Sequence, residues 1–301
     1  MPSLIRPFYP QFDTLIAAIA ALNYRELRHF LWCNVRPRPE RFLYRFRELN
    51  PTDLKSINRI QQIIVGSQLW LSSPEDFNDP FDMSAEIMVK GTLKERKQRF
   101  HEFLKAQHKE LSWIQRRQLL PSFISKPSSE YSANFQKEFD RTIRNAGVCS
   151  FGIEGQNILM WSHYCARHTG VCFQFEVARD PATFLQAVPV EYDQNFPTVN
   201  WVKEYEKSIK VVMTRKHPNW AYEKERRIVI PGGARRQHPF RPEALTGIIL
   251  GCRSDEAVVA MLKDLLDERA AAGLPMPRIY QAQIHGSQYR LVIQKSRLNL
   301  S

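Results

Sequence analysis

The sequence lacks several patterns that identify common classes of protein. Its five cysteines form no CxxC pair and cannot all be bridged, which favours a reducing compartment. The longest apolar run, Leu15 to Leu22, is far shorter than the roughly 20 residues of a membrane-spanning helix. Neither GxGxxG nor GxxxxGK(S/T) occurs, so the known dinucleotide and triphosphate cradles are excluded. We therefore expect a cytoplasmic protein without a membrane-spanning segment.

The composition is that of an ordinary globular protein with an excess of positive charge. Hydrophobic residues make up 43% and charged residues 25% of the 301 residues, which excludes disordered and fibrous classes. Lys and Arg number 43 against 31 acids, a net charge of +12. This surplus favours acidic partners. We expect a nucleotide or another acidic small molecule, with nucleic acid as a further candidate for the basic surface.

The chain is expected to divide into an N-terminal arm and one larger domain. Residues 1–40 are predicted to form a helix, with apolar spacing up to Leu31, and a Pro-rich linker. Residues 41–301 are predicted to form a single domain. Within it, residues 91–146 carry 12 basic and 6 acidic side chains and have apolar positions at helical spacing, which predicts an all-helical insertion.

Short strands and helices mix along the chain without regular alternation. This favours an α+β fold, with a compact mixed β core of short strands and flanking helices, over a doubly wound sheet. Further helices are predicted over residues 52–65 and 255–272. Strands are predicted over residues 42–46, 68–72, 147–151, 170–177, 187–192, 226–230, 247–250 and 288–294.

Three clusters hold side chains that could do chemistry. The first, Ser72 to Asp82, follows a predicted strand and is dense in Ser, Asn, Asp and Pro. Such residues satisfy backbone donors and fix turns, so a plain turn is the simpler interpretation of this cluster.

The second cluster, Leu159 to Cys172, contains a short predicted helix. Trp161, Tyr164 and His168 fall three and four residues apart on it, and His163 points elsewhere. Core packing is the default interpretation of the aromatic residues. Histidine and tyrosine donors on one short helix also suit a phosphate or a ribose.

A zinc site is another interpretation of the second cluster. Cys165 and His168 would share a helix face, and Cys172 follows soon after. No fourth Cys or His lies at a standard ligand spacing, so we expect no metal.

The third cluster, Lys216 to Ile230, carries two glutamates among basic residues. If the chain is extended here, Glu223, Glu225 and Arg227 share one face and form either an ion-pair ladder or a catalytic set. If it is helical, Glu223 and Arg227 are an ordinary i, i+4 pair worth about 0.3–0.5 kcal/mol. Without other information the ion-pair ladder is favoured.

Taken together, these strings resemble the bacterial family catalogued as domain of unknown function 2971. The resemblance spans about Leu43 to Leu266 and leaves out the first 40 residues. It implies membership of the family but no activity. The strings that carry it are Leu43-Tyr44-Arg45-Phe46-Arg47, Leu71-Ser72-Ser73-Pro74, Phe77-Asn78-Asp79-Pro80-Phe81-Asp82, Met160-Trp161-Ser162-His163-Tyr164, His168-Thr169-Gly170-Val171-Cys172, Trp220-Ala221-Tyr222-Glu223-Lys224-Glu225-Arg226-Arg227 and Ile248-Ile249-Leu250-Gly251.

A second resemblance, to folds of the ADP-ribosyltransferase type, implies a chemistry. In that family an Arg or His on a first strand contacts NAD, and a Ser, Thr or Tyr on a second strand braces the ribose. A Glu on a third strand stabilises an oxocarbenium-like centre and activates the acceptor. Arg45, Ser72 and either glutamate of the third cluster follow that order here. The resemblance implies NAD as a co-substrate and Glu223 and Glu225 as catalytic residues, with Arg45 and Ser72 at the cofactor. The Trp161 to His168 cluster has no fixed counterpart in that family, but we expect it to line the same pocket. The cofactor-binding residues expected in all are Arg45, Tyr44, Ser72, Asn78, Trp161, His163, Tyr164, His168 and Arg227.

The sequence thus leaves three functions open. The first is a cytosolic ADP-ribosyltransferase or NAD glycohydrolase that acts as a toxin or defence effector, for example in phage defence. The second is a nucleic-acid-binding or nuclease-like protein in which carboxylates hold a divalent metal. The candidates for those carboxylates are Asp79, Asp82, Glu223 and Glu225. The third is a non-catalytic binding module whose shared strings build the core.

Overall fold

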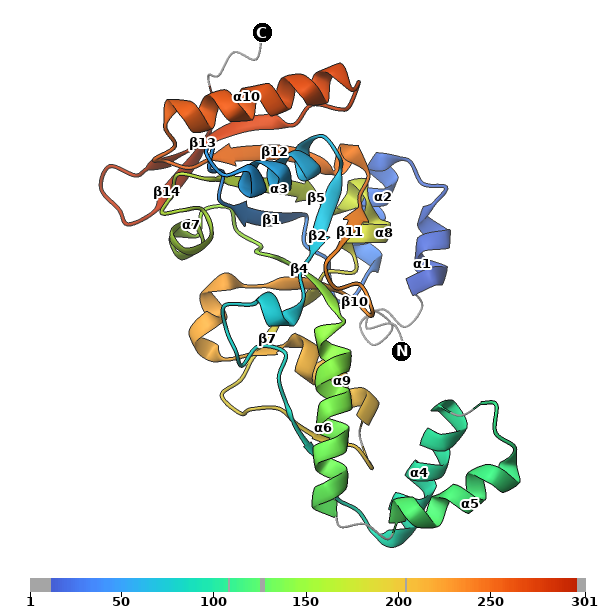
Figure 1. Ribbon diagram of the computed structural model, residues 1–301. Helices are drawn as coiled ribbons and strands as arrows, with labels where there is room; N and C mark the ends of the chain where they lie inside the picture. Colours follow the sequence, from blue (N-terminus) through green and yellow to red (C-terminus); the bar gives the residue numbers. More distant parts are fainter. Residues whose placement is uncertain (1–11, 108, 125–127, 204, 297–301) are drawn as a thin grey trace. The chain divides into compact units, whose positions relative to one another are not determined.

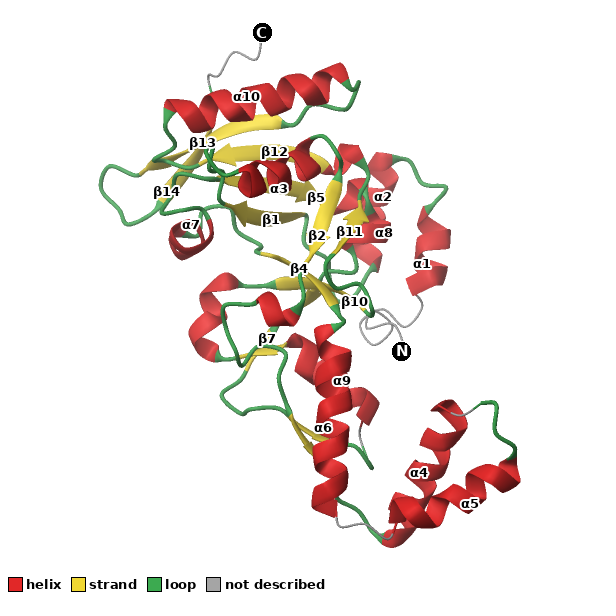
Figure 2. Cartoon of the chain, viewed as in Figure 1, coloured by secondary structure: helices red, strands yellow, loops and turns green. Residues whose placement is uncertain are grey.

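The chain forms a mixed fold of helices and short strands. A computed structural model describes residues 12–296 except 108, 125–127 and 204 (Figure 2). The predicted α+β class is confirmed. The chain splits into two compact units: Met1–Ser73, Gly147–Val190 and Asn219–Ser301 form the first, and Pro74–Ala146 and Glu191–Pro218 form the second.

A five-stranded sheet lies at the centre of the first unit (Figure 1). Its strand order is β1-β5-β12-β13-β14, and all neighbours are antiparallel except β12 and β13, which are parallel. The bounds of these strands are β1 Phe42–Arg47, β5 Val171–Glu176, β12 Leu245–Leu250, β13 Arg278–Ile284 and β14 Leu291–Lys295.

Strand β5 is covered on both faces of this sheet. Phe173 and Phe175 are fully buried in the main core on one face, and Cys172 packs on the other face in the cluster that contains Trp161. Because side chains alternate along a strand, a run that is apolar at successive positions needs cover on both sides. Gln174 and, at the end of the strand, Glu176 are the polar exceptions in β5.

Helices supply that cover. Helices α3 and α10 lie on the face of the main core (Figure 1), and each begins at an aspartate, Asp53 and Asp255, whose side chain accepts a hydrogen bond from a backbone N–H of the first turn. Helix α7 covers the opposite face through Trp161. The bounds are α1 Phe12–Ile19, α2 Tyr24–Asn34, α3 Leu54–Ile64, α7 Ile158–Tyr164, α8 Pro181–Phe184 and α10 Glu256–Ala271, with the 3-10 helices η2 Val177–Arg179, η3 Pro218–Glu223 and η4 Pro242–Ala244.

Two smaller antiparallel sheets complete the first unit. One has the order β4-β10-β6, and the other pairs β2 with β11. Isolated bridges join Ser72 to Val148 and Tyr44 to Gly152, so the chain at β4 connects to both β2 and β1. The bounds are β2 Gln68–Leu71, β4 Gly147–Phe151, β6 Val188–Pro189, β10 Arg226–Ile230 and β11 Arg236–Pro239.

The second unit consists of helices and two short pairs of parallel strands, β3 with β8 and β7 with β9. Aromatic rings form its core: Phe135 stacks on Trp201 with ring centroids 4.1 Å apart, and Phe100 lies 5.0 Å from the same ring. Helices occupy most of residues 91–146, where the sequence predicts a helical insertion. The bounds are η1 Pro74–Asp76, β3 Glu86–Met88, α4 Leu93–Gln107, α5 Trp113–Ile124, α6 Ser128–Arg144, β7 Glu191–Tyr192, β8 Thr198–Asn200, α9 Tyr205–Thr214 and β9 Arg215–Lys216.

The N-terminal region departs from the sequence-based expectation. The single helix predicted up to Leu31 is two helices, α1 and α2, because Asn23 starts a new one. The Asn23 side chain accepts hydrogen bonds from two backbone N–H groups, and the Glu26 side chain accepts from the Asn23 backbone, which is a capping box.

Other departures concern strands, since β3, β8, β9 and β11 were not predicted. The strand predicted over residues 187–192 is two short strands, β6 and β7, which belong to different units. Strand β13 was not predicted, because only Ile279 and Ala282 of its seven residues are buried and its apolar signal is weak. None of the described helices is both long and apolar enough to cross a membrane.

Candidate active site

The loop after β4 brings three of the family strings together. Tyr44 in β1 exchanges two backbone hydrogen bonds with Gly152. Five residues later, Asn157 caps α7 by accepting hydrogen bonds from two of its backbone N–H groups. The Asn157 amide also donates to the carbonyl oxygen of Tyr222 in η3. Residues near positions 44, 160 and 222 therefore meet around one loop.

Trp161 fixes the inner side of this arrangement. Its side chain is fully buried, its Nε1 donates to the Gly155 carbonyl oxygen at 2.8 Å, and its ring meets Phe46 edge-on at 5.4 Å. Gly155 itself lies against Tyr44, since a Cβ there would be 2.9 Å from the tyrosine ring. Trp161 is thus a core residue, which is the default interpretation of its position in the sequence.

Tyr164 and Glu223 form the polar centre of the arrangement, called the Tyr164–Glu223 site below. The Tyr164 hydroxyl donates to Oε1 of Glu223 at 2.6 Å, and the glutamate is 5% exposed. His163, one residue earlier, is exposed, and its ring centroid lies 5.9 Å from that of Tyr222. The site therefore combines the carboxylate of Glu223, which is fixed by a hydrogen bond, with the phenol of Tyr164 and the exposed imidazole of His163.

The predicted position of His168 on the helix is wrong. Helix α7 ends at Tyr164, and Ala166, Arg167 and His168 have positive φ angles of 45°, 58° and 73°. The turn nevertheless returns the His168 ring to Trp161, with the rings stacked at 6.4 Å, and brings its Nε2 within 3.0 Å of the Ser162 hydroxyl. Burial, with a smaller effect of Arg253, lowers the pKa of His168.

The cysteines near this turn are buried as thiols. The Cys165 Sγ donates to the Val171 carbonyl oxygen, and burial raises the pKa of both Cys165 and Cys172 far above the ordinary range. Among the residues that the structure describes, no group of three or more His, Cys, Asp or Glu side chains is placed to hold a metal ion.

The carboxylates considered for a divalent metal do not lie in one unit. Asp79 and Asp82 belong to the second unit, whereas Glu223 and Glu225 belong to the first. Asp82 is buried and pairs with Lys216 at 3.5 Å.

Glu225 and Arg227 form a buried ion pair. The Arg227 Nε and Nη2 donate to the two carboxylate oxygens of Glu225, each at 2.9 Å, and the two residues are 3% and 0% exposed. Neither alternative for the stretch 223–227 is correct as a whole. Glu223 ends the 3-10 helix η3, and Lys224 has a φ of +45°, so the extended chain begins only after it. Glu225 pairs with Arg227, whereas the Glu223 carboxylate accepts from Tyr164.

Arg45 lies in the core rather than at the Tyr164–Glu223 site. One of its terminal nitrogens donates to the Cys149 Sγ at 2.7 Å and to the Ser150 carbonyl oxygen at 3.0 Å, and the other donates to the Trp70 carbonyl oxygen at 3.2 Å. Its side chain thereby connects β1, β2 and β4. Ser72 also lies here, at its backbone bridge to Val148.

The predicted site residues are thus distributed over separate places. Asn78 is exposed and belongs to the second unit. Arg45, Ser72, Glu225 and Arg227 lie around β4. The residues that gather around α7 and η3 are Tyr44, Trp161, His163, Tyr164, His168 and Glu223.

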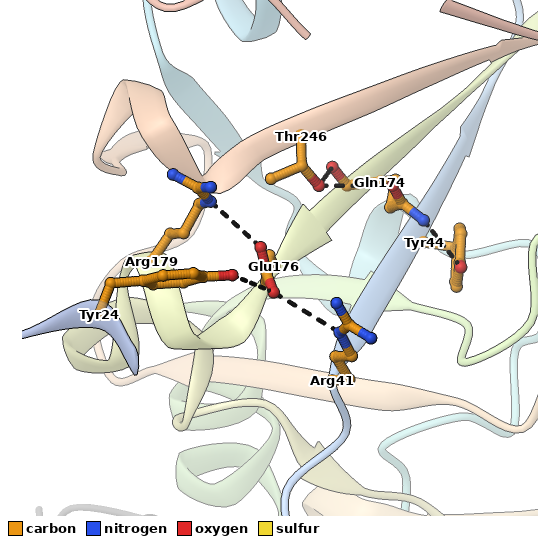
Figure 3. Close-up of polar contacts among 7 residues, drawn as sticks. All are labelled: Tyr24, Arg41, Tyr44, Gln174, Glu176, Arg179 and Thr246. Atoms are coloured by element: carbon orange, nitrogen blue, oxygen red, sulfur yellow. Dashed lines mark hydrogen bonds and ion pairs between the residues drawn. The ribbon is translucent and has the colours of Figure 1, made fainter. Parts of the chain in front are cut away.

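The sequence interpretation missed residues that complete this second group. The Gln174 amide donates to the Tyr44 hydroxyl at 3.1 Å, and Thr246 donates to the Gln174 carbonyl oxygen at 3.3 Å (Figure 3). Burial raises the pKa of Tyr44. Gln174 is a polar residue between two phenylalanines of β5, and this signal was available in the sequence. Gly155 carries no comparable signal.

Comparisons with known proteins support the family resemblance. The sequence model of the family described as protein of unknown function (DUF2971) matches residues 160–228. This segment contains both the Tyr164–Glu223 contact and the Glu225–Arg227 pair, whereas the strings near residues 43–47 and 71–82 precede it. No curated protein and no solved structure matched the chain. The predicted resemblance to the DUF2971 family is confirmed over residues 160–228, where the family model matches.

Proposed function

We propose that the protein is an NAD-using enzyme that breaks the bond between nicotinamide and ribose, as an ADP-ribosyltransferase or an NAD glycohydrolase. The observation that supports this proposal best is the hydrogen bond from Tyr164 to Glu223. It holds a carboxylate in one orientation inside the segment that matches the family. His163, the residue before Tyr164, is exposed, and its ring lies 5.9 Å from that of Tyr222, so polar donors lie at the surface near this hydrogen bond.

A fixed carboxylate suits this chemistry. When the C–N bond breaks, its electron pair leaves with nicotinamide and positive charge develops on the ribose ring. Glu223 stabilises that charge. The same carboxylate then accepts the proton of the water or acceptor hydroxyl whose oxygen forms the new bond to the ribose carbon. Tyr164 positions Glu223, because its hydroxyl occupies Oε1.

The remaining residues divide between binding and structure. The rings of Tyr44, Tyr164 and Tyr222 pack against the apolar cluster that contains Trp161, and they offer aromatic surface for nicotinamide and ribose. Arg45 fits a diphosphate poorly, since its terminal nitrogens already donate to two carbonyl oxygens and a thiol. In this proposal Glu225 has no chemical role, because Arg227 neutralises its charge.

The direct test measures nicotinamide release from NAD by the purified protein, with and without DNA or RNA as acceptor. We expect turnover by the wild type and a loss of at least about 100-fold in Glu223→Gln. Glu154→Gln is the matched control, because Glu154 is an exposed glutamate that pairs with Lys224 on the surface. A folded Glu223→Gln protein with wild-type turnover, or a wild type that releases no nicotinamide with any acceptor, would overturn the proposal.

We extend the proposal to the cell, where this activity belongs to a toxin or defence effector. Expression of the wild type is then expected to lower cellular NAD and slow growth, and expression of Glu223→Gln at the same level is expected to do neither. Equal growth and equal NAD in the two cultures would contradict the effector role, even if the purified protein hydrolyses NAD.

A further inference from the structure

A cavity of 740 Å³ lies in the first unit, apart from the Tyr164–Glu223 site. It is formed by one face of α2, the chain that leads into β1, and the end of β5 with the start of η2. None of the family strings quoted above supplies its wall. Such a volume is typical of pockets for small molecules. The residues that line it are Tyr24, Arg25, Arg28, His29, Leu31, Trp32, Pro39, Glu40, Arg41, Glu176, Val177 and Ala178.

Helix α2 supplies one wall because of its spacing. Tyr24, Arg28 and Trp32 are four residues apart and lie on one face, next to the cavity. Leu27 and Leu31 are buried in the main core, which fixes the helix against the rest of the unit. Because these leucines fix the helix, the side chains of Tyr24, Arg28 and Trp32 keep a defined position at the cavity.

Glu176 is one of the residues that line the cavity, and several side chains hold it in place. It is 4% exposed and accepts a hydrogen bond from the Tyr24 hydroxyl at 2.6 Å (Figure 3). The guanidinium groups of Arg179 and Arg41 lie 3.1 and 3.6 Å from its oxygens. Two cations thus neutralise this carboxylate, and the hydrogen bond fixes the Tyr24 ring at the edge of the cavity.

The charge that remains on the lining is positive. Its two acidic residues are both engaged: Glu176 as described, and Glu40 by Arg226 at 2.5 Å. Within the part of the chain that the structure describes, neither Arg25 nor Arg28 pairs with a carboxylate. Both are exposed, so their guanidinium groups are available to an anion.

Aromatic surface lies next to these cations. Trp32 is 53% exposed, and Arg38 lies over its ring at 4.1 Å. Tyr24 is 38% exposed, with Arg28 at 5.6 Å from its ring centroid. An exposed indole beside unpaired guanidinium groups matches the two parts of a nucleotide, a flat base and a phosphate.

We propose that this cavity binds a nucleotide, with the base against the Trp32 ring and the phosphate at Arg25 and Arg28. The nucleotide is either free or one unit of a single strand, since both present the same base and phosphate. This site goes beyond the proposed function and does not depend on it, because Glu223 takes no part in it.

The test is calorimetric titration of the full-length protein with AMP, adenosine, inorganic phosphate and a single-stranded oligoadenylate. We expect AMP to bind and both adenosine and phosphate to bind at least about tenfold more weakly, since each lacks half of the recognised chemistry. Tighter binding of the oligonucleotide than of AMP identifies a strand as the ligand, and equal binding identifies a free nucleotide.

The variants separate this cavity from the general basic charge. Arg28→Gln and Trp32→Leu are each expected to weaken AMP binding about tenfold or more. A second exposed pair provides the matched control, because Arg117 lies 5.3 Å from the ring centroid of Trp113, which is 54% exposed, on α5 outside the cavity. Arg117→Gln and Trp113→Leu are expected to bind AMP as the wild type does.

Three results would overturn the inference. The first is a failure of AMP and oligoadenylate to bind. The second is equal binding of phosphate and AMP, which would show that no base is recognised. The third is an equal loss in the α5 control variants. Binding of AMP to Glu223→Gln with wild-type affinity distinguishes this site from the proposed catalytic site.

Discussion

Glu223 and Glu225 are separated by one residue, yet the side chains that bind their carboxylates here are of different kinds. Glu225 receives two hydrogen bonds from the guanidinium of Arg227, and both groups are buried. Glu223 accepts a hydrogen bond from the neutral hydroxyl of Tyr164. A carboxylate neutralised by a buried cation is suited to holding a fold together, whereas one held by a hydroxyl is suited to acting on a ligand.

The backbone at Lys224 produces this difference. Lys224 has a positive φ and lies between the end of the 3-10 helix η3 and the start of strand β10. The chain is therefore not extended from Glu223 to Glu225, and the alternation of side chains along a strand does not apply to these two residues. One short segment therefore contains both an ion pair that stabilises the fold, Glu225 with Arg227, and a carboxylate that is suited to acting on a ligand, that of Glu223.

The largest expected effect is on the Glu225–Arg227 pair. Arg227→Met leaves the Glu225 carboxylate buried without its cation, and we expect the free energy of unfolding to fall by about 3–5 kcal/mol. Urea unfolding measures this loss. The double variant Glu225→Leu with Arg227→Met is expected to recover much of it, because no charge is then left buried. A single variant as stable as the wild type would contradict the structural role of the pair.

A smaller effect is expected at Arg45, for which the resemblance to ADP-ribosyltransferase-type folds implied contact with NAD. Arg45→Met removes the donors to the carbonyl oxygens of Ser150 and Trp70, and we expect a loss of about 1–3 kcal/mol in the free energy of unfolding. The KM for NAD is expected to stay unchanged. An Arg45→Met variant that is as stable as the wild type but has a greatly raised KM for NAD would instead indicate that Arg45 binds NAD.

The smallest effect concerns the pH dependence of stability at His168. Its pKa in the folded protein lies below the ordinary 6.5, because of burial and then Arg253, so the unfolded chain takes up the proton first as pH falls. Stability is therefore lost below about pH 6.5. The urea midpoint of unfolding is expected to fall when the pH is lowered from about 7.5 to about 5.5, and this fall is expected to be smaller in His168→Asn than in the wild type. The control is His163→Asn, because the ring of His163 is exposed. If the fall in urea midpoint became smaller by the same amount in both variants, its assignment to His168 would be contradicted.

Much of the fold could be predicted from local sequence. Strand β10 lies where the sequence predicts it, at residues 226–230, because the β-branched run Ile228-Val229-Ile230 favours a strand. The single N-terminal helix and the missing strand β13 show the limit of such patterns. A capping side chain such as Asn23 interrupts an apolar period that looks continuous. A strand with only two buried residues, such as β13, gives almost no period.

The candidate site could be predicted only in part. From residue types alone, Tyr164 and Glu223 were predicted to be site residues, and the structure brings them together. Arg45 and Glu225 were predicted on the same grounds, but Arg45 binds groups in the core and Glu225 pairs with buried Arg227. The difference depends on which long-range neighbour meets each side chain, and no local pattern encodes that. The cavity beside α2 was missed because its walls come from residues that are far apart in the sequence.

The most direct test of the account compares Glu223→Gln with Glu225→Gln, measuring both urea unfolding and NAD turnover for each. For Glu223→Gln we expect a stability change of about 1 kcal/mol or less and loss of turnover, since the amide oxygen still accepts from Tyr164. For Glu225→Gln we expect a loss of at least about 2 kcal/mol, because Arg227 is left buried without its anion, and turnover in proportion to the folded fraction. A stable, inactive Glu225→Gln beside an active Glu223→Gln would contradict the central claim.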